Sequence, residues 1–85
     1  MTVDDSASMK TYIVKYICAD DELQEETSFI IEASSIAKAV AELVASFGKD
    51  YNPANIDFVS ISADGEDLGE DGIYAAEVAL ADYYT

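Results

Sequence analysis

The chain has 85 residues, of which 18 are Asp or Glu and 4 are Lys or Arg, and its formal charge is −14. This length suffices for one small domain, and a hydrophobic content of 51% provides the core residues that a disordered acidic tail lacks. Four cationic side chains cannot form the basic surface that binds phosphates or anionic lipid, so we expect no direct contact with nucleic acid and no membrane binding.

The sequence also argues against an internal disulfide, a membrane span and a signal peptide. Cys18 is the one cysteine, so it cannot form a disulfide within the chain, which favours a reducing compartment. No stretch approaches the ~18 apolar residues that a membrane span needs. The N-terminus lacks the positive region and apolar run of a signal peptide. We therefore expect a cytoplasmic protein.

The first half of the chain predicts a hairpin. Residues 1–9 are small, polar and acidic, and we expect them to be disordered, with one domain over residues 10–85. Residues 10–18 (KTYIVKYIC) predict a strand, because they are β-branched and aromatic without Gly or Pro. Both faces of this strand are apolar, which indicates a central strand covered on both sides. Residues 27–33 (TSFIIEA) predict a second strand after the acidic loop 19–26.

A helix is predicted next. Ser34 and Ser35 offer N-cap hydroxyls, and Gly48 is well placed to end the helix. Between them, apolar residues recur at i, i+4, i+7, i+8 and i+11, which predicts about three helical turns. This stripe consists of Ile36, Val40, Leu43, Val44 and Phe47.

The second half predicts a strand and another helix. Residues 56–63 (IDFVSISA) predict a third strand, which ends at Asp64-Gly65, and residues 64–72 form a second acidic loop. Residues 73–84 favour a helix capped by Asp71, because apolar residues recur there with helical spacing. A strand over residues 73–78 is the alternative.

These elements predict an α+β domain with a three-stranded β-β-α-β sheet. The crossover makes the third strand parallel to the second, so the first strand lies between them, in order 2-1-3. The long helix covers one face of the sheet. The C-terminal helix or a partner covers the other.

The acids favour neither catalysis nor a metal site. A catalytic carboxylate pair needs at least one buried member with a shifted pKa, whereas every acid within a predicted strand or helix takes a solvent-facing position. A calcium loop that starts at Asp64 fails, because Leu68 and Ala75 occupy two ligand positions. The acids within predicted strands or helices are Glu32, Glu42, Asp57 and Glu77.

Nucleophilic and phosphate-binding chemistry lack the necessary residues. Cys18 has no histidine to activate it, so we interpret it as a core residue. Gly65, Gly69 and Gly72 are interleaved with acids that would repel phosphate. We predict that the protein is not an enzyme and has no cofactor or metal.

Ten of the 18 acids lie in two short segments. Clustering favours docking on a basic protein surface, whereas adaptation to a salty environment would spread the charge evenly; an acidic surface without any partner is the third interpretation. The two segments lie at opposite ends of the sheet if the first and third strands are antiparallel. The predicted partner-binding residues are Asp20, Asp21, Glu22, Glu25, Glu26, Asp64, Glu66, Asp67, Glu70 and Asp71.

Six tyrosines are the other unusual feature. They are core and rim aromatics of a small sheet, or they form an aromatic protein interface. In the second interpretation an uncovered sheet face with Tyr12 and Tyr16 could pair two copies into a homodimer. The candidate interface residues are Tyr12, Tyr16, Tyr74, Tyr83 and Tyr84.

Residues 10–62 resemble small phage-encoded proteins, including some anti-CRISPR proteins. The resemblance rests on the strand 10–18, the strand that ends in Phe29-Ile-Ile-Glu-Ala33, the helix that opens Ser34-Ser-Ile-Ala-Lys-Ala39, and the strand 56–61. It implies a phage-encoded inhibitor of a nucleic-acid-handling machine, acting in the host cytoplasm. Our hypothesis is a noncatalytic, DNA-mimic-like protein that docks on a basic nucleic-acid-binding surface of a host protein. The alternative is a homo-oligomeric structural or assembly protein from a phage or halophilic source.

Overall fold

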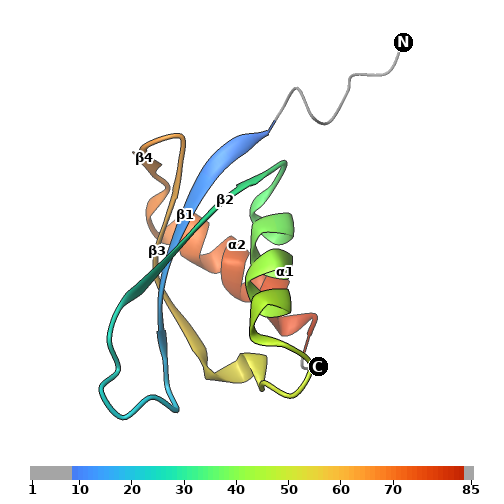
Figure 1. The fold of residues 1–85 in the computed structure, drawn as a ribbon. Helices are drawn as coiled ribbons and strands as arrows, with labels where there is room; N and C mark the ends of the chain where they lie inside the picture. Colours follow the sequence, from blue (N-terminus) through green and yellow to red (C-terminus); the bar gives the residue numbers. More distant parts are fainter. Residues whose placement is uncertain (1–8, 84–85) are drawn as a thin grey trace.

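A computed structural model describes residues 9–83, in which one sheet carries two helices (Figure 1). The disorder expected for residues 1–8 lies outside the described residues, as does Tyr84. The elements are β1 (Lys10–Cys18), β2 (Thr27–Ala33), α1 (Ile36–Phe47), the 3₁₀ helix η2 (Pro53–Asn55), β3 (Ile56–Ala63), β4 (Glu66–Asp67) and α2 (Gly69–Ala81).

β1 is the inner strand on which the sheet is built. It pairs antiparallel with β2 on one side and with β3 on the other, and the sheet order is β2-β1-β3-β4. Because both neighbours run against β1, β2 and β3 run in the same direction, as expected of a β-α-β crossover. The predicted α+β class and the order 2-1-3 are confirmed.

The sheet has four strands where three were predicted, because residues 64–72 are not one loop. Asp64 and Gly65 have φ angles of 51° and 85°, and this pair of positive angles is typical of a two-residue hairpin turn. The chain therefore folds back on itself, and β4 pairs antiparallel with the end of β3.

The C-terminal segment is a helix, as favoured, but it begins at Gly69 rather than at residue 73. Leu68 is the N-cap residue and has no capping side chain, but Asp67 before it satisfies the first free N–H of the helix, since its Oδ1 atom accepts a hydrogen bond of 2.8 Å from the backbone N–H of Gly69. Asp71, predicted as the cap, lies in the first turn beside Glu70, where the helix dipole favours carboxylates.

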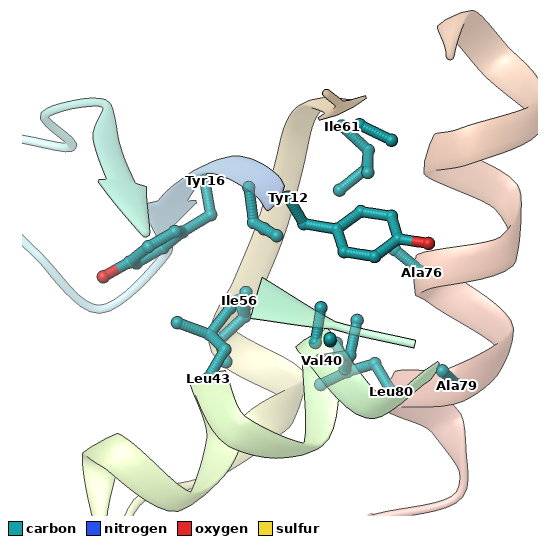
Figure 2. Close-up of a cluster of buried hydrophobic side chains, with 13 residues drawn as sticks. Tyr12, Tyr16, Val40, Leu43, Ile56, Ile61, Ala76, Ala79 and Leu80 are labelled. Atoms are coloured by element: carbon teal, nitrogen blue, oxygen red, sulfur yellow. The ribbon is translucent and has the colours of Figure 1, made fainter. Parts of the chain in front are cut away.

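Both helices pack on the same face of the sheet, so of the two predicted alternatives for the other face, the C-terminal helix or a partner, the first is wrong. α2 contacts β3 and α1, and the buried alanines Ala76 and Ala79 let it approach its neighbours closely. Figure 2 shows the ring of Tyr12 directed toward α2 near Ala76. One face of the antiparallel sheet is thus left uncovered by the helices. The other buried core residues are Val14, Tyr16, Ala33, Ala39, Val40, Leu43, Ile56, Ile61, Ala63 and Leu80.

A β-bulge brings both halves of β3 to the core. The pairing of β1 with β3 shifts by one residue between Lys15 and Tyr16. Ile56 and Ile61 can therefore both be buried, although they are an odd number of residues apart. The residue near this shift, Val59, is 37% exposed.

We expect Gly72→Ala to destabilise the protein. A Cβ atom at Gly72 would lie 2.6 Å from Leu68 Cβ and 3.3 Å from Ile61 Cβ. Overpacking of this kind costs about 1–3 kcal/mol, which outweighs the ~1 kcal/mol that alanine gains in helix propensity. A lower urea midpoint with an unchanged m-value would confirm the close contact. A higher midpoint would show that α2 has room there.

Candidate docking surface

The first group of predicted acids forms what we term the loop cluster, in the β1–β2 connection: Asp20, Asp21, Glu22, Glu25 and Glu26. All five are exposed. The connection is held by a backbone hydrogen bond of 2.7 Å from Ala19 N to Asn55 O. Asp21 Oδ1 also accepts a hydrogen bond of 3.2 Å from Leu23 N, which shapes the turn.

An aromatic column connects the loop cluster to the core. The Tyr51 hydroxyl donates a hydrogen bond of 2.9 Å to Asp20 Oδ1, across 31 residues of sequence. The ring of Tyr51 stacks on Phe47 with centroids 4.5 Å apart, and Phe47 meets the ring of Tyr16 edge-on at 5.8 Å. Burial raises the pKa of Tyr51 above its ordinary value of 10.0, and the neighbouring Cys18 and the hydrogen-bonded Asp20 raise it further. The column therefore fixes one end of the acidic loop.

The second group of acids, the hairpin cluster, extends from the β3–β4 turn to the first turn of α2: Asp64, Glu66, Asp67, Glu70 and Asp71. All five are exposed. Asp64 ties the cluster to β1, because its Oδ1 atom accepts a hydrogen bond of 2.8 Å from Thr11 N, and its own N–H donates one of the same length to Thr11 O. A further bond of 2.9 Å joins Leu68 N to Ile61 O.

The two clusters lie at opposite ends of the sheet (Figure 1). The hairpin cluster is bonded to Thr11 and the loop cluster follows Cys18, at the two ends of β1. A separation of seven strand residues corresponds to about 23 Å. The sequence expectation that antiparallel strands place the two segments at opposite ends agrees with this arrangement.

The ten predicted acids divide into two sets by their contacts. Asp20, Asp21, Asp64 and Asp67 accept the hydrogen bonds described above. The carboxylates of the other six have no hydrogen bond or ion pair with any residue in the part of the chain that the structure describes. These six are Glu22, Glu25, Glu26, Glu66, Glu70 and Asp71.

The predicted aromatic interface is divided between the core and the surface. Tyr12 and Tyr16 are 5% and 9% exposed beneath the helices, so they belong to the core and do not lie on an uncovered face. Tyr74 and Tyr83 are exposed, and Val78 lies one turn after Tyr74 on α2. Because Glu70 lies one turn before Tyr74, the hairpin cluster continues along α2 as an apolar strip of Tyr74 and Val78.

The open face of the sheet carries isoleucine and lysine side chains, whereas the sequence predicted Tyr12 and Tyr16 on an uncovered face. Ile13 of β1 lies opposite Ile30 of β2, and Ile30 is 65% exposed. Lys15 lies on the same face between Ser28 and Ser60. The isoleucines at alternate positions of β1 predict a second layer that covers this face. The structure instead leaves these side chains on an open face, between the two acidic clusters, that also carries the charged residues Lys15, Glu32 and Asp57.

Residues 9–83 contain neither a cluster of metal-binding side chains nor a helix that could cross a membrane. No three His, Cys, Asp or Glu side chains gather there closely enough to hold a metal ion. No helix in that range has the length and apolar character needed to cross a membrane. Every buried residue described is hydrophobic, and Cys18 is half-buried against the core.

The chain has no match among the protein-family models, the curated proteins or the solved structures with which it was compared. Its function is therefore argued from charge and geometry.

We expect stability to fall at alkaline pH in a way that depends on Tyr51. With a raised pKa, folded Tyr51 keeps its proton above pH 10.0, where the unfolded chain releases it. The unfolded state then binds fewer protons, so stability is retained below about pH 10 and lost as pH rises further. Tyr51→Phe should make the decline of the urea midpoint shallower and, at neutral pH, cost roughly 0.5–1.5 kcal/mol for the lost hydrogen bond. An equally steep decline in the variant would contradict this role.

Proposed function

We propose that this protein is a noncatalytic inhibitor that docks on a basic, nucleic-acid-binding surface of another protein and excludes nucleic acid from it. The observation that carries the proposal is the pair of exposed acidic clusters, each hydrogen-bonded to the framework at one end of β1. Only four cations are available in the whole chain to offset 18 acids, so most of this charge is available to a partner.

Carboxylates in such an array can replace phosphates. Duplex DNA presents about one negative charge per 1.7 Å of its axis, and basic proteins bind it through Lys and Arg contacts to phosphate. Carboxylates offer the same side chains charge-assisted hydrogen bonds. The hydrogen bonds of Asp20 and Asp64 restrain the two clusters before binding, which lowers the entropic cost of association.

The absence of buried polar side chains from residues 9–83 supports the noncatalytic part of the proposal. A general acid or base at neutral pH usually needs a carboxyl group in a desolvated environment that shifts its pKa. Glu32, Glu42, Asp57 and Glu77 are all exposed, as are the ten acids of the two clusters. These side chains are suited to attracting a partner.

The strip of Tyr74 and Val78 adds an apolar contact beside the hairpin cluster. Tyr74 is 69% exposed and Val78 is 49% exposed, which is unusual for large side chains on a helix that otherwise packs on the core. Tyrosine is enriched among the residues that carry most of the binding energy at protein interfaces. We propose that the charges direct the approach of the partner and that this strip then packs against it.

The resemblance of residues 10–62 to small phage-encoded inhibitors is the reason to seek the partner among host nucleic-acid-handling proteins. In this form of the proposal the protein acts in the host cytoplasm. Tagged protein should therefore capture a basic nucleic-acid-binding protein from a host lysate at low salt, and the captured protein should lose its nucleic acid.

Neutralising either cluster should weaken this complex. The variants Glu22/Glu25/Glu26→Gln and Glu66/Glu70→Gln with Asp71→Asn each remove three charges that have no hydrogen bond within the described residues. We expect each to raise the dissociation constant by about 10- to 100-fold at low salt, and to reduce the dependence of binding on salt concentration. Titration by fluorescence anisotropy with the captured partner measures both quantities.

The matched control removes the same charge elsewhere. Glu42→Gln, Asp50→Asn and Asp57→Asn also change three exposed acids, outside both clusters. This control should bind within about threefold of the wild type, because its three acids belong to neither cluster. Binding that resists salt, or that falls equally in the control, would contradict docking through the clusters.

A further inference from the structure

β2 is an edge of the sheet whose outer backbone groups pair with no other strand among residues 9–83. Proteins usually protect such an edge with proline, a bulge, a central lysine or a covering segment. The opposite edge has a bulge in β3 and is partly covered by β4. β2 has none of these features and places Phe29, Ile30 and Ile31 in a row. It is therefore the better template for another strand.

The side chains of β2 are also incompletely buried. Phe29 and Ile31 lie on the helix side, where each packs against the core but is only partly buried. Ile30 lies on the open side and is 65% exposed. An additional strand at this edge would shield apolar side chains on both faces at once.

A second β2 fits this edge in one antiparallel register. With Ile30 opposite Ile30 of the second copy, Phe29 lies opposite Ile31 and Ser28 opposite Glu32. No two like charges face each other within the strand, and the central pair is apolar. This self-complementarity is what an isologous interface requires.

The charges at the two ends of β2 differ. Glu25 and Glu26 precede the strand, whereas Ala33 at its other end pairs with Lys10. Beyond Ala33 comes the N-terminus of α1, with Lys38 in its first turn and a positive dipole end. Antiparallel pairing brings the acidic start of each strand toward the end of the other that carries Lys38, where Glu32 offsets part of that positive charge and lies diagonally opposite Glu26.

We propose that two copies of this protein associate through β2, with the two-fold axis at Ile30, to form one continuous sheet. This proposal does not depend on the docking function, because the pairing is made by the backbone and apolar side chains of β2, which the docking function does not use. Two copies of a seven-residue strand bury less surface than the roughly 1,200 Å² of a standard interface, so the dimer is weak.

Salt should have opposite effects on dimerisation and on docking. Each copy carries a charge of −14, so the two repel each other, and added salt screens this repulsion. Docking on a basic surface instead weakens as salt rises. The two proposals can therefore fail separately.

Sedimentation equilibrium of the full chain over a range of sodium chloride concentrations tests the proposal. We expect the dimer fraction to rise with salt and Ile30→Lys to weaken self-association by roughly tenfold or more, since two lysines would then face each other at the axis. Val59→Lys, with the same charge change near the opposite edge, should dimerise at least as well as the wild type. A monomer at every salt concentration, or a dimer that Val59→Lys weakens and Ile30→Lys does not, would overturn the proposal.

A cross-link provides a second measurement that does not depend on the folding of Ile30→Lys. In a Cys18→Ser background, Ile30→Cys should oxidise at high salt to a disulfide-bonded dimer, because directly opposed strand residues have Cα atoms within disulfide reach. Val59→Cys in the same background should yield far less. Equal yields would argue against pairing at β2.

Discussion

The packing of one side of β1 against both helices determines the rest of this structure. Tyr12, Val14 and Tyr16 lie beneath α1 and α2, and β1 pairs with a strand on each side. Because both helices pack on this face, no helix within residues 9–83 covers the other face. The loop cluster follows Cys18 at one end of β1, and the hairpin cluster is hydrogen-bonded to Thr11 at the other end. One strand thus fixes the core, the open face and the separation of the clusters.

Charge and burial are sharply separated in the molecule. No charged side chain is buried within the described residues, so the carboxylates lie at the surface. Those of the two clusters lie at the ends of the sheet. Some of them stabilise the fold: Asp64 ties the hairpin to β1, and Asp67 accepts a hydrogen bond from the first N–H of α2. The acids without such contacts remain available to a partner. The hydrogen bonds therefore distinguish the acids that stabilise the fold from those proposed to bind a partner.

Much of the fold could be predicted because the local signals agree. β1 and β3 have the predicted bounds, since each is β-branched or aromatic and ends at polar turn residues. β4 was missed although Asp64-Gly65 is a hairpin signal, and the spacing of Ile56, Phe58 and Ile61 could have indicated the bulge. The face that α2 covers depends on its fit to α1 and β3, which no local pattern contains.

The candidate site was predictable in part for the same reason. Exposure of the acids follows from their chemistry, and their positions at opposite ends follow from the antiparallel pairing. The hydrogen bond between Tyr51 and Asp20 joins residues 31 apart in sequence, so no periodicity could reveal it. Composition also could not separate the buried Tyr12 and Tyr16 from the exposed Tyr74.

The proposed docking function requires one partner to contact both acidic clusters at once. Amide hydrogen exchange of the free protein and of its complex with the captured partner tests this directly. Binding should slow exchange in residues 19–26 and in residues 64–72 together, with little change along α1. Slower exchange in only one of these segments, or along β2 alone, would contradict it.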